Sequence, residues 1–433
     1  MILILYTTLY RTGGDKFQRA AKTMAKEKQR QYPGMIVHCA AVESKSDFLF
    51  QLGRAEELGQ KIRELHFIGH SGVYGIMFGT TSWPEQFSPY EWKMMKAPVT
   101  EETEFYFHAC RTGRWFAPFV SRALGVKAYG YFWYTSISTK KDQFGWEAFS
   151  RKSEDLYIIS CAGKKSHGYL ATVGKYLGFA KVFPLLRFDL KNQSVDSTYD
   201  EVAQNYDETF ADIKVRNDEW SWIVANQDAW AGKKILDIGC GNAALLQELS
   251  PRLEQGVGVD LSLGMINQAK KRNESRKNLR FYKIDGPHLP LEDNSVDTVI
   301  SMLSFRYLDW DPMIHEMLRV LKPGGEIMIL DMVAAPVKLS EVHLFVVSKL
   351  KYLIQKITHP QFHQTLQKMV SDGAWKKMLE FNPIRSEHEM KWYLESRFPG
   401  RQIKLLNVGW NSRIVSFRTG PIQTKSVEKI SYP

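Results

Sequence analysis

Cysteine is scarce in this chain of 433 residues, which contains only four. Cys39, Cys110, Cys161 and Cys240 are scattered, with none of the close spacings that a zinc site or a disulfide framework requires. This excludes a small secreted scaffold held together by disulfides and favours a reducing compartment. We therefore expect a cytoplasmic protein without a metal site.

Long apolar runs are also missing. The N-terminal MILILY has neither a basic lead-in nor a small-residue cleavage site, so it predicts a buried strand rather than a signal peptide. The most apolar later stretch, 342–357, is interrupted by Lys349, Lys351 and Lys356. It falls short of the roughly 18 uninterrupted apolar residues of a membrane span, and we expect no span.

The net charge of +11 permits an anionic partner. The basic residues lie along expected helices such as 16–30 and 270–280, where polar and acidic residues are mixed with them. We favour solvated helix faces, and a nucleic-acid or lipid surface is the alternative.

The first part of the chain alternates β-rich apolar runs with amphipathic segments, which is typical of a mostly parallel sheet flanked by helices. The expected strands are 2–9, 35–42, 65–69, 104–109 and 126–132, and the expected helices are 15–31, 47–63 and 115–124. A poorly periodic stretch follows over about 150–195. We place a boundary near 190, which gives an α/β domain with its linker over 1–190 and a second domain over 191–433.

The second domain is expected to be a doubly wound, Rossmann-like α/β fold that binds ligands at the carboxyl ends of its strands. A helix over 200–229 leads in. Strands are expected at 234–238, 256–259, 279–284, 296–302, 325–332, 402–408 and 414–418, with helices at 243–249, 265–276, 311–321 and 386–397. A helical insert over about 336–400 follows the fifth strand, and we predict that 336–385 forms a mobile lid over the site.

The motif ILDIGCGNAALL opens this domain. Its strand ends at Asp237, and Gly239 and Gly241 form a tight turn where a ligand can lie against bare backbone. Cys240 between them is expected to be a small packing residue. Taken alone, the motif also fits a dinucleotide-binding loop, with Ala244 in the place of the third glycine.

Three further elements distinguish these alternatives. Asp260 ends the next strand, where a carboxylate can accept both hydroxyls of a ribose. Asp285 ends the third strand, where it can accept from an adenine amine, and a Pro-Gly-Gly turn at 323–325 precedes a buried strand. Over about 200–333, this ordered set resembles the class I, type 11 S-adenosylmethionine-dependent methyltransferases, which include enzymes that methylate quinone precursors.

The resemblance implies S-adenosyl-L-methionine as the cofactor. The residues expected to bind it are Asp237, Gly239, Cys240, Gly241, Asp260, Leu261, Met265, Asp285, Gly286, Met302 and Tyr206. The segment 199–210 looks like the lead-in helix that closes over the cofactor in this family. Arg306 and Tyr307 follow the fourth strand at the mouth of the site and are candidate substrate contacts.

Two strand ends in the first domain also contain candidate catalytic residues. LHFIGHSG places His70 after one apolar strand, and FYFHACRTG places Cys110 after the next. Adjacent parallel strands would bring the two side chains to one edge, as a thiol nucleophile and its imidazole base require. The pattern resembles the caspase-like cysteine peptidases, which include the gingipains, and implies that His70 is the base and Cys110 the nucleophile.

This second resemblance has one departure. Ser71 separates His70 from Gly72, where many members have glycine directly, and this puts the oxyanion geometry in question. An inactive caspase-like scaffold is an equal alternative. His108 should face the same side as Cys110 by the period of a strand, so it is a further candidate to replace or perturb the pair.

The leading hypothesis is methyl transfer to a small-molecule acceptor by a chain whose first domain is a peptidase or binds a protein partner. The alternatives are a regulatory or sensor protein with an inactive caspase-like domain, and a protein or nucleic-acid methyltransferase. SMLSF stands after the fourth strand, where enzymes that act on flipped bases carry an Asn-Pro-Pro-Tyr type motif. A nucleic-acid substrate is therefore disfavoured.

Overall fold

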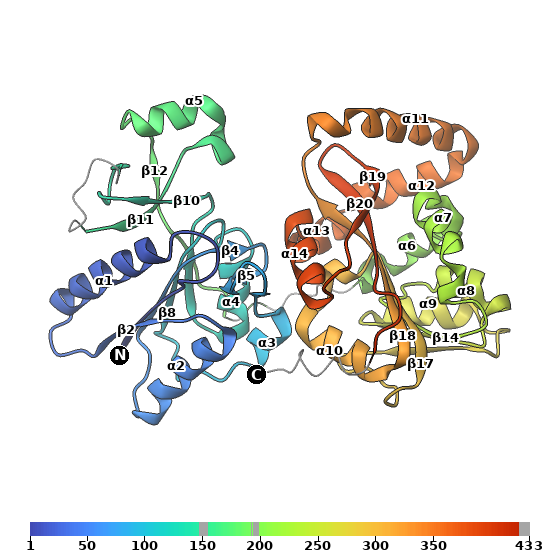
Figure 1. The fold of residues 1–433 in the computed structure, drawn as a ribbon, viewed down its shortest axis with the longest axis horizontal. Coiled ribbons are helices and arrows are strands. Elements are labelled where there is room, and N and C mark those ends of the chain that lie inside the picture. The colour runs from blue at the N-terminus through green and yellow to red at the C-terminus, as the bar shows by residue number, and fades with distance from the viewer. Residues whose placement is uncertain (147–154, 192, 194–198, 424–433) are drawn as a thin grey trace. The chain divides into compact units, whose positions relative to one another are not determined.

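The computed structural model describes residues 1–146, 155–191, 193 and 199–423 (Figure 1). The chain divides into two compact units, Met1–Ser194 and Val195–Pro433. No described helix combines the length and the apolar character needed to cross a membrane. Each unit has a hydrophobic core of its own.

A six-stranded sheet forms the centre of the first unit. Its strands are β1 (Ile2–Tyr6), β2 (Val37–Ala41), β3 (Glu64–Ile68), β8 (Glu104–His108), β9 (Lys127–Gly130) and β13 (Leu186–Phe188), in the order β13-β9-β8-β3-β1-β2. The first five run parallel to their neighbours, and β13 is antiparallel to β9. The predicted mostly parallel sheet is confirmed.

The three predicted helices of this unit are present as α1 (Gly14–Gln31), α2 (Lys45–Glu57) and α4 (Phe116–Leu124). Helix α2 starts at a capping box, because Ser44 and Asp47 each bond the other's backbone N–H. It ends before the predicted residue 63, since Gly59 adopts a left-handed φ of 64° that stops the helix. The short helix α3 (Pro89–Met94) and two small hairpins complete the segment before β8. The hairpins are formed by β4 (Ser71–Gly72) with β5 (Gly75–Ile76) and by β6 (Phe78–Gly79) with β7 (Pro84–Glu85).

The described part of the stretch 150–195, which was expected to be poorly periodic and to contain the linker, belongs to the first unit. Its described part forms β11 (Tyr157–Cys161), α5 (Lys164–Tyr176), β12 (Val182–Phe183) and β13. Strand β11 pairs with β10 (Thr135–Ser138) and β12 in a separate antiparallel sheet. These strands are too short for a two-residue period to be visible, so the hydrophobic pattern of this part of the sequence is irregular.

The second unit contains a seven-stranded sheet. Its strands are β14 (Lys234–Ile238), β15 (Gln255–Asp260), β16 (Leu279–Lys283), β17 (Val296–Met302), β18 (Leu321–Ala334), β19 (Lys404–Val408) and β20 (Ser412–Arg418), in the order β16-β15-β14-β17-β18-β20-β19. Only β20 runs antiparallel to its neighbours. The chain reverses direction across the sheet between β14 and β17, which confirms the doubly wound order and marks the place where such folds bind ligands.

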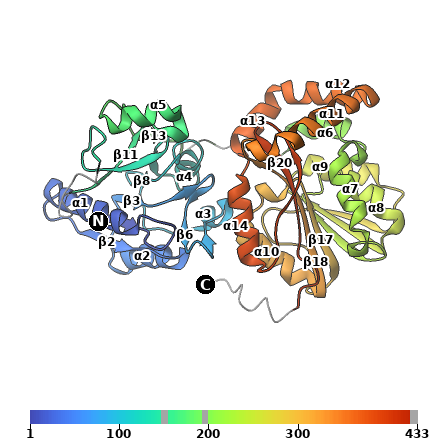
Figure 2. The same cartoon turned by 45° about the horizontal axis from the view of Figure 1, so that its top comes forward.

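Helices cover both faces of this sheet (Figure 2). The covering helices are α7 (Asn217–Ala225), α8 (Ala244–Leu249), α9 (Leu263–Arg272), α10 (Trp310–Val320) and α14 (Glu387–Arg397). Residues of α10 and α14 fill one apolar cluster with the sheet, and residues of α7, α8 and α9 fill another.

The lead-in segment is not the single helix expected over 200–229. It consists of α6 (Ala203–Thr209) and α7, separated and flanked by 3₁₀ turns at Asp200–Val202, Ile213–Val215 and Gln227–Ala229. The Asp212 carboxylate accepts from Lys214 N at 2.8 Å and starts a new turn. Local side-chain bonds of this kind compete with continuation of a helix.

The insert after β18 is helical, as predicted. It contains α11 (Val342–Thr358), α12 (Pro360–Ser371) and α13 (Gly373–Phe381). Proline at the first position of α12 suits a helix start, and Asp372 caps α13 by accepting from Ala374 N at 2.7 Å.

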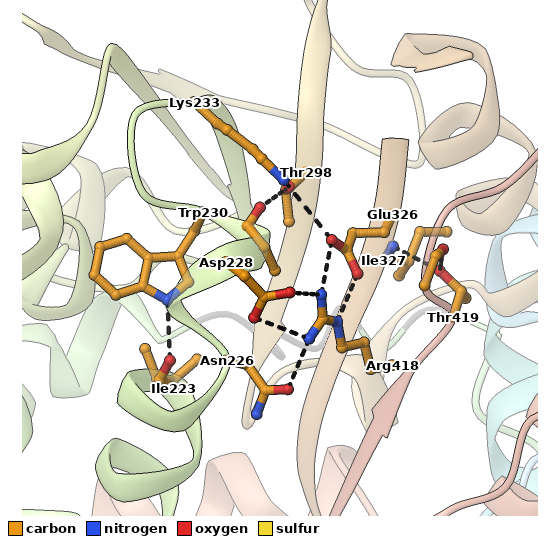
Figure 3. A network of polar contacts seen from close by, with 12 residues as sticks. Ile223, Asn226, Asp228, Trp230, Lys233, Thr298, Glu326, Ile327, Arg418 and Thr419 are labelled. Carbon is orange, nitrogen blue, oxygen red and sulfur yellow. Dashed lines mark hydrogen bonds and ion pairs between the residues drawn. The ribbon is translucent and has the colours of Figure 1, made fainter. Parts of the chain in front are cut away.

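An ionic network joins the end of the lead-in segment to the sheet (Figure 3). The Arg418 guanidinium, at the end of β20, donates to Glu326 on β18 and to Asp228, each at 2.6 Å, and to the Asn226 side chain at 3.0 Å. Thr298 on β17 donates to a backbone carbonyl of the same segment. The network lies toward the amino ends of the parallel strands, away from the ligand edge.

We expect Arg418→Met to destabilise the second unit by on the order of 2 to 3 kcal/mol, because it leaves the buried Glu326 carboxylate without its main partner. The matched control is Lys234→Met, which removes the exposed pair with Glu254 and should cost less than about 1 kcal/mol. Urea unfolding measures both. Equal effects of the two substitutions would contradict the prediction.

Candidate cofactor site

The turn after β14 is built from glycine backbone, with Ser304 packed against Gly239 and Tyr206 beside Gly241. Gly239 and Gly241 have φ values of 70° and 53°, in the left-handed region. A Cβ on Gly239 would lie 2.3 Å from that of Ser304. Ser304 itself donates to Ile238 O at 2.6 Å and so ties the ends of β14 and β17 together. This role of Ser304 was not predicted from the sequence.

Asp260 fastens this turn to the end of β15. One carboxylate oxygen accepts from Gly241 N and the other from Ser262 N, each at 2.9 Å. Every carboxylate oxygen has a second lone pair, so both can still accept from a ligand. The carboxylate therefore lies beside the bare backbone and is available for ribose hydroxyls.

Asp237 lies below the turn with an unusual lack of partners. It is 2% exposed, and its Oδ1 has no hydrogen-bond partner among the described residues. Burial, reinforced by the charge of Asp260, raises the pKa of Asp237 to about 7. An unpaired buried carboxylate is costly, so the site favours a positively charged ligand. The sulfonium and ammonium groups of S-adenosyl-L-methionine fit this requirement.

The lead-in segment covers the turn. Asp200 accepts from Ser262 Oγ at 2.6 Å and from Gly264 N at 2.7 Å. A carbon of the Tyr206 ring lies 3.6 Å from the position that a Cβ on Gly241 would occupy. Helix α6 is thus held against the loop after β15, with Tyr206 beside the glycine backbone.

Two of the predicted cofactor residues are packed in the interior. Cys240 is buried, and burial raises the pKa of its thiol well above the usual value, so the group stays protonated. Met265 is buried in α9. Both support the site from beneath, and Cys240 has the environment of the packing residue that the sequence predicted.

The other predicted residues border the site. Leu261 is exposed directly after β15. Asp285 and Gly286 follow β16, and the exposed Asp285 carboxylate pairs with Lys283. Met302 ends β17 and is half-buried. Their contacts with a cofactor stay predictions.

Arg306, for which substrate contact stays a prediction, also has a structural role. Its guanidinium is buried and forms an ion pair with Asp331 on β18, whose other oxygen accepts from Arg306 N at 2.5 Å. The pair holds the turn after β17 against the sheet. The neighbouring Tyr307 is half-buried and stays a candidate for substrate contact.

An aromatic cluster that was not predicted from the sequence lies around Tyr199 and includes Tyr307. The Tyr199 ring lies 5.9 Å from those of Tyr206 and Trp375 and 6.4 Å from that of Tyr307, measured between centroids. Burial raises the pKa of Tyr199 well above its usual value, so its hydroxyl remains protonated. The rings come from the lead-in segment, the turn after β17 and α13, which are distant in sequence.

In the first unit, His70 and Cys110 follow neighbouring parallel strands. Ile68 of β3 pairs with His108 of β8, so the two candidates lie at equivalent positions, two residues beyond this pair. His70 Nε2 bonds Thr12 O at 3.0 Å, and the Cys110 thiol lies 3.2 Å from Thr135 Oγ1. No hydrogen bond joins His70 to Cys110 within the described part of the chain.

The hydrogen bond of the His108 ring is made with His66 and not with Cys110. Its ring is buried, and its Nε2 lies 3.1 Å from Nδ1 of His66. The idea that His108 replaces or perturbs the His70 and Cys110 pair is therefore not supported by its contacts.

Residues 236–329 match the family model described as a methyltransferase domain. A demethylmenaquinone methyltransferase of Clavibacter sepedonicus is 33% identical over 161 residues, which cover 36% of this chain and 65% of that protein. A protein of the same name from Staphylococcus epidermidis is 28% identical over 202 residues, covering 44% and 79%. The chain thus spans just under two thirds of the Clavibacter relative.

Among solved structures, a SAM-dependent methyltransferase from Aquifex aeolicus is similar to 52% of this chain over its full length, with 18% identity and a TM-score of 0.33. Residues 236–329 are thus similar to a methyltransferase domain. The cofactor is S-adenosyl-L-methionine, and the glycine turn at Gly241 and the carboxylates of Asp237 and Asp260 fit this molecule.

The pKa of Asp237 predicts a pH dependence. It is raised from 3.8 to about 7, so between these values the folded domain holds a proton that the unfolded chain has released. The ligand-free domain should therefore lose stability as pH rises through this window. A cationic ligand prefers the ionised carboxylate, so the affinity for S-adenosyl-L-methionine should rise up to roughly tenfold from pH 6 to 8.

Isothermal titration of wild type and Asp237→Asn across this range measures the effect. The variant should show a flatter profile, because the ligand's own titration is common to both proteins. Asp293→Asn, which changes an exposed carboxylate, is the control and should keep the wild-type slope. An unchanged slope in Asp237→Asn would exclude this carboxylate as the cause.

Proposed function

We propose that the second unit transfers a methyl group from S-adenosyl-L-methionine to an apolar small-molecule acceptor of the quinone-precursor class. The observation that carries the proposal is the aromatic cluster of Tyr199, Tyr206, Tyr307 and Trp375 beside the glycine turn. Aromatic faces suit a flat, apolar ring. The relatives named demethylmenaquinone methyltransferases support the same acceptor class.

The surface of the insert agrees with an apolar acceptor. Helix α11 exposes Leu350, Leu353, Ile354 and Ile357 to solvent. A nucleic acid would instead be bound by basic side chains free to reach phosphates. Lys351 of the same helix already pairs with Asp218 at 2.6 Å.

The chemistry that the cofactor supplies is an electrophilic methyl group on sulfur. The chain has to align the acceptor with it and exclude water. Tyr199, protonated because of its raised pKa, can donate a hydrogen bond to an acceptor oxygen. Tyr206, held over Gly241, can separate the reacting groups from solvent.

The test is transfer of labelled methyl from S-adenosyl-L-methionine to a demethylmenaquinone analogue with a short side chain. Trp375→Ala should raise KM for the acceptor about tenfold or more while leaving cofactor affinity within about twofold, because it removes one wall of the cluster. Asp260→Ala should weaken cofactor binding instead. Failure of the wild-type protein to label the analogue while it still binds the cofactor would reject this acceptor class.

We propose for the first unit a caspase-like scaffold with a thiol site at His70 and Cys110. The parallel pairing of β3 and β8, which puts the two residues at matched positions, favours this arrangement. Burial lowers the pKa of His70, so its ring is neutral and able to act as a base. Activity requires the Cys110 thiol to leave Thr135 and approach the ring. All four cysteines are free, in keeping with a cytoplasmic setting.

A cysteine-directed probe such as iodoacetamide tests this second proposal. Cys110 should react at least about tenfold faster than half-buried Cys39, and His70→Ala should remove the difference, because the thiolate is the reactive form. Mass spectrometry of the labelled peptides gives both rates. Equal rates for Cys110 with and without His70 would indicate an inactive scaffold, the alternative that suits a regulatory role.

A further inference from the structure

A chain of buried polar side chains crosses one face of the first unit's sheet. His66 Nε2 lies 2.8 Å from the Glu64 carboxylate, and His66 Nδ1 lies 3.1 Å from His108 Nε2. Lys28 pairs with Glu64 at 2.5 Å. Glu64, His66 and His108 are all buried. The alternation of a strand explains the first pair, because Glu64 and His66 are two residues apart on β3.

These hydrogen bonds determine which atoms of Glu64, His66 and His108 carry a proton. Burial opposes ionisation of Glu64, but the hydrogen bonds from His66 and Lys28 outweigh it and lower the pKa to about 2. An ionised carboxylate only accepts, so His66 carries its proton on Nε2. Burial also lowers the pKa of His66 and His108, which are therefore neutral.

A neutral imidazole has one donor and one acceptor nitrogen. His66 Nδ1 is then the acceptor, and His108 Nε2 donates to it. This leaves the lone pair of His108 Nδ1 at the end of the hydrogen-bonded series of side chains. Among the described residues, the bond from Nε2 to His66 is the hydrogen bond that the His108 ring makes.

His108 is part of the wall of a cavity of about 290 Å³. The cavity is bounded by α1, the ends of β3 and β8, and the strands β11 and β12. Its apolar wall includes Met24, Ile68, Leu156, Ile159, Val182 and Phe183. This volume is at the lower end of the range for small-molecule sites.

The other polar side chains among the described lining residues are already paired, including Tyr157, whose hydroxyl interacts with Glu27. Tyr131 donates its hydroxyl to Ile158 O at 3.0 Å, and Lys141 forms an ion pair with Glu27 at 2.7 Å. His108 Nδ1 is therefore the acceptor left for a ligand. The wall offers no unpaired charge that would hold an ionic ligand.

We propose that this cavity binds a small apolar molecule with one hydroxyl group, a phenol or an alcohol, which donates its hydrogen bond to His108. The ionised Glu64 at the far end polarises the two imidazoles and strengthens the terminal acceptor. The site lies wholly in the first unit and is separate from the cofactor site and from Cys110. It stands whether or not the functions proposed above are correct.

A pair of probes that differ in one group tests the role of the acceptor. Para-propylphenol should bind the full-length protein about fivefold to tenfold more tightly than para-propylfluorobenzene, in which fluorine replaces the hydroxyl. His108→Leu keeps a side chain of similar size without the acceptor, and it should remove this preference while leaving the affinity for the fluoro compound within about twofold. Isothermal titration measures both. Equal binding of the two probes to wild type would overturn the proposal.

Two further measurements keep the test decisive if His108→Leu folds poorly. Val182→Trp, at the half-buried edge of the cavity, should fill the space and abolish binding of both probes. In wild type, the nitrogen resonances of labelled histidine should show His66 and His108 protonated on Nε2, and para-propylphenol should shift His108 Nδ1. Phenol binding that survives Val182→Trp, or a His108 resonance that does not respond, would place the ligand elsewhere and refute the site.

Discussion

The bonds of the Asp260 carboxylate hold the cofactor site together. They connect the glycine turn after β14 to the loop after β15, so two neighbouring strand ends act as one unit. Ser262, which Asp260 orients, in turn holds Asp200 of the lead-in segment. Helix α6 and Tyr206 therefore depend on the same carboxylate that is expected to receive the ribose. The expected ribose contact and the position of the lead-in segment thus depend on one side chain.

Much of the second unit could be predicted from the sequence because its signals are local. The strands before and after Gly239 and Gly241, and Asp260 at the end of the next strand, follow from apolar runs and turn residues. The ion pair between Arg306 and Asp331 could not be predicted, since no spacing rule links residues on different elements. The same limit hid Tyr199 and Trp375, which meet only after folding.

Physical causes also explain why two other predicted segments differ from the structure. The expected single helix over 200–229 fails at Asp212, whose carboxylate bonds the backbone two residues on. The stretch 150–195, expected to contain the linker, includes β13, which has three residues and carries little periodic signal, yet it completes the edge of the main sheet beside β9. Short elements that depend on tertiary pairing are the ones that sequence patterns miss.

The two units differ in whether a buried carboxylate has a cationic partner. In the first, Glu64 is fully compensated by Lys28 and His66, so it stays ionised without a ligand. In the second, Asp237 has no cationic partner among the described residues, and burial raises its pKa to about 7, so the group is half protonated near neutral pH. A compensated carboxylate can orient its neighbours permanently, whereas an uncompensated one gains most when a cation arrives. The second arrangement would favour a positively charged ligand, because a cation beside Asp237 would offset the cost of burying its ionised form.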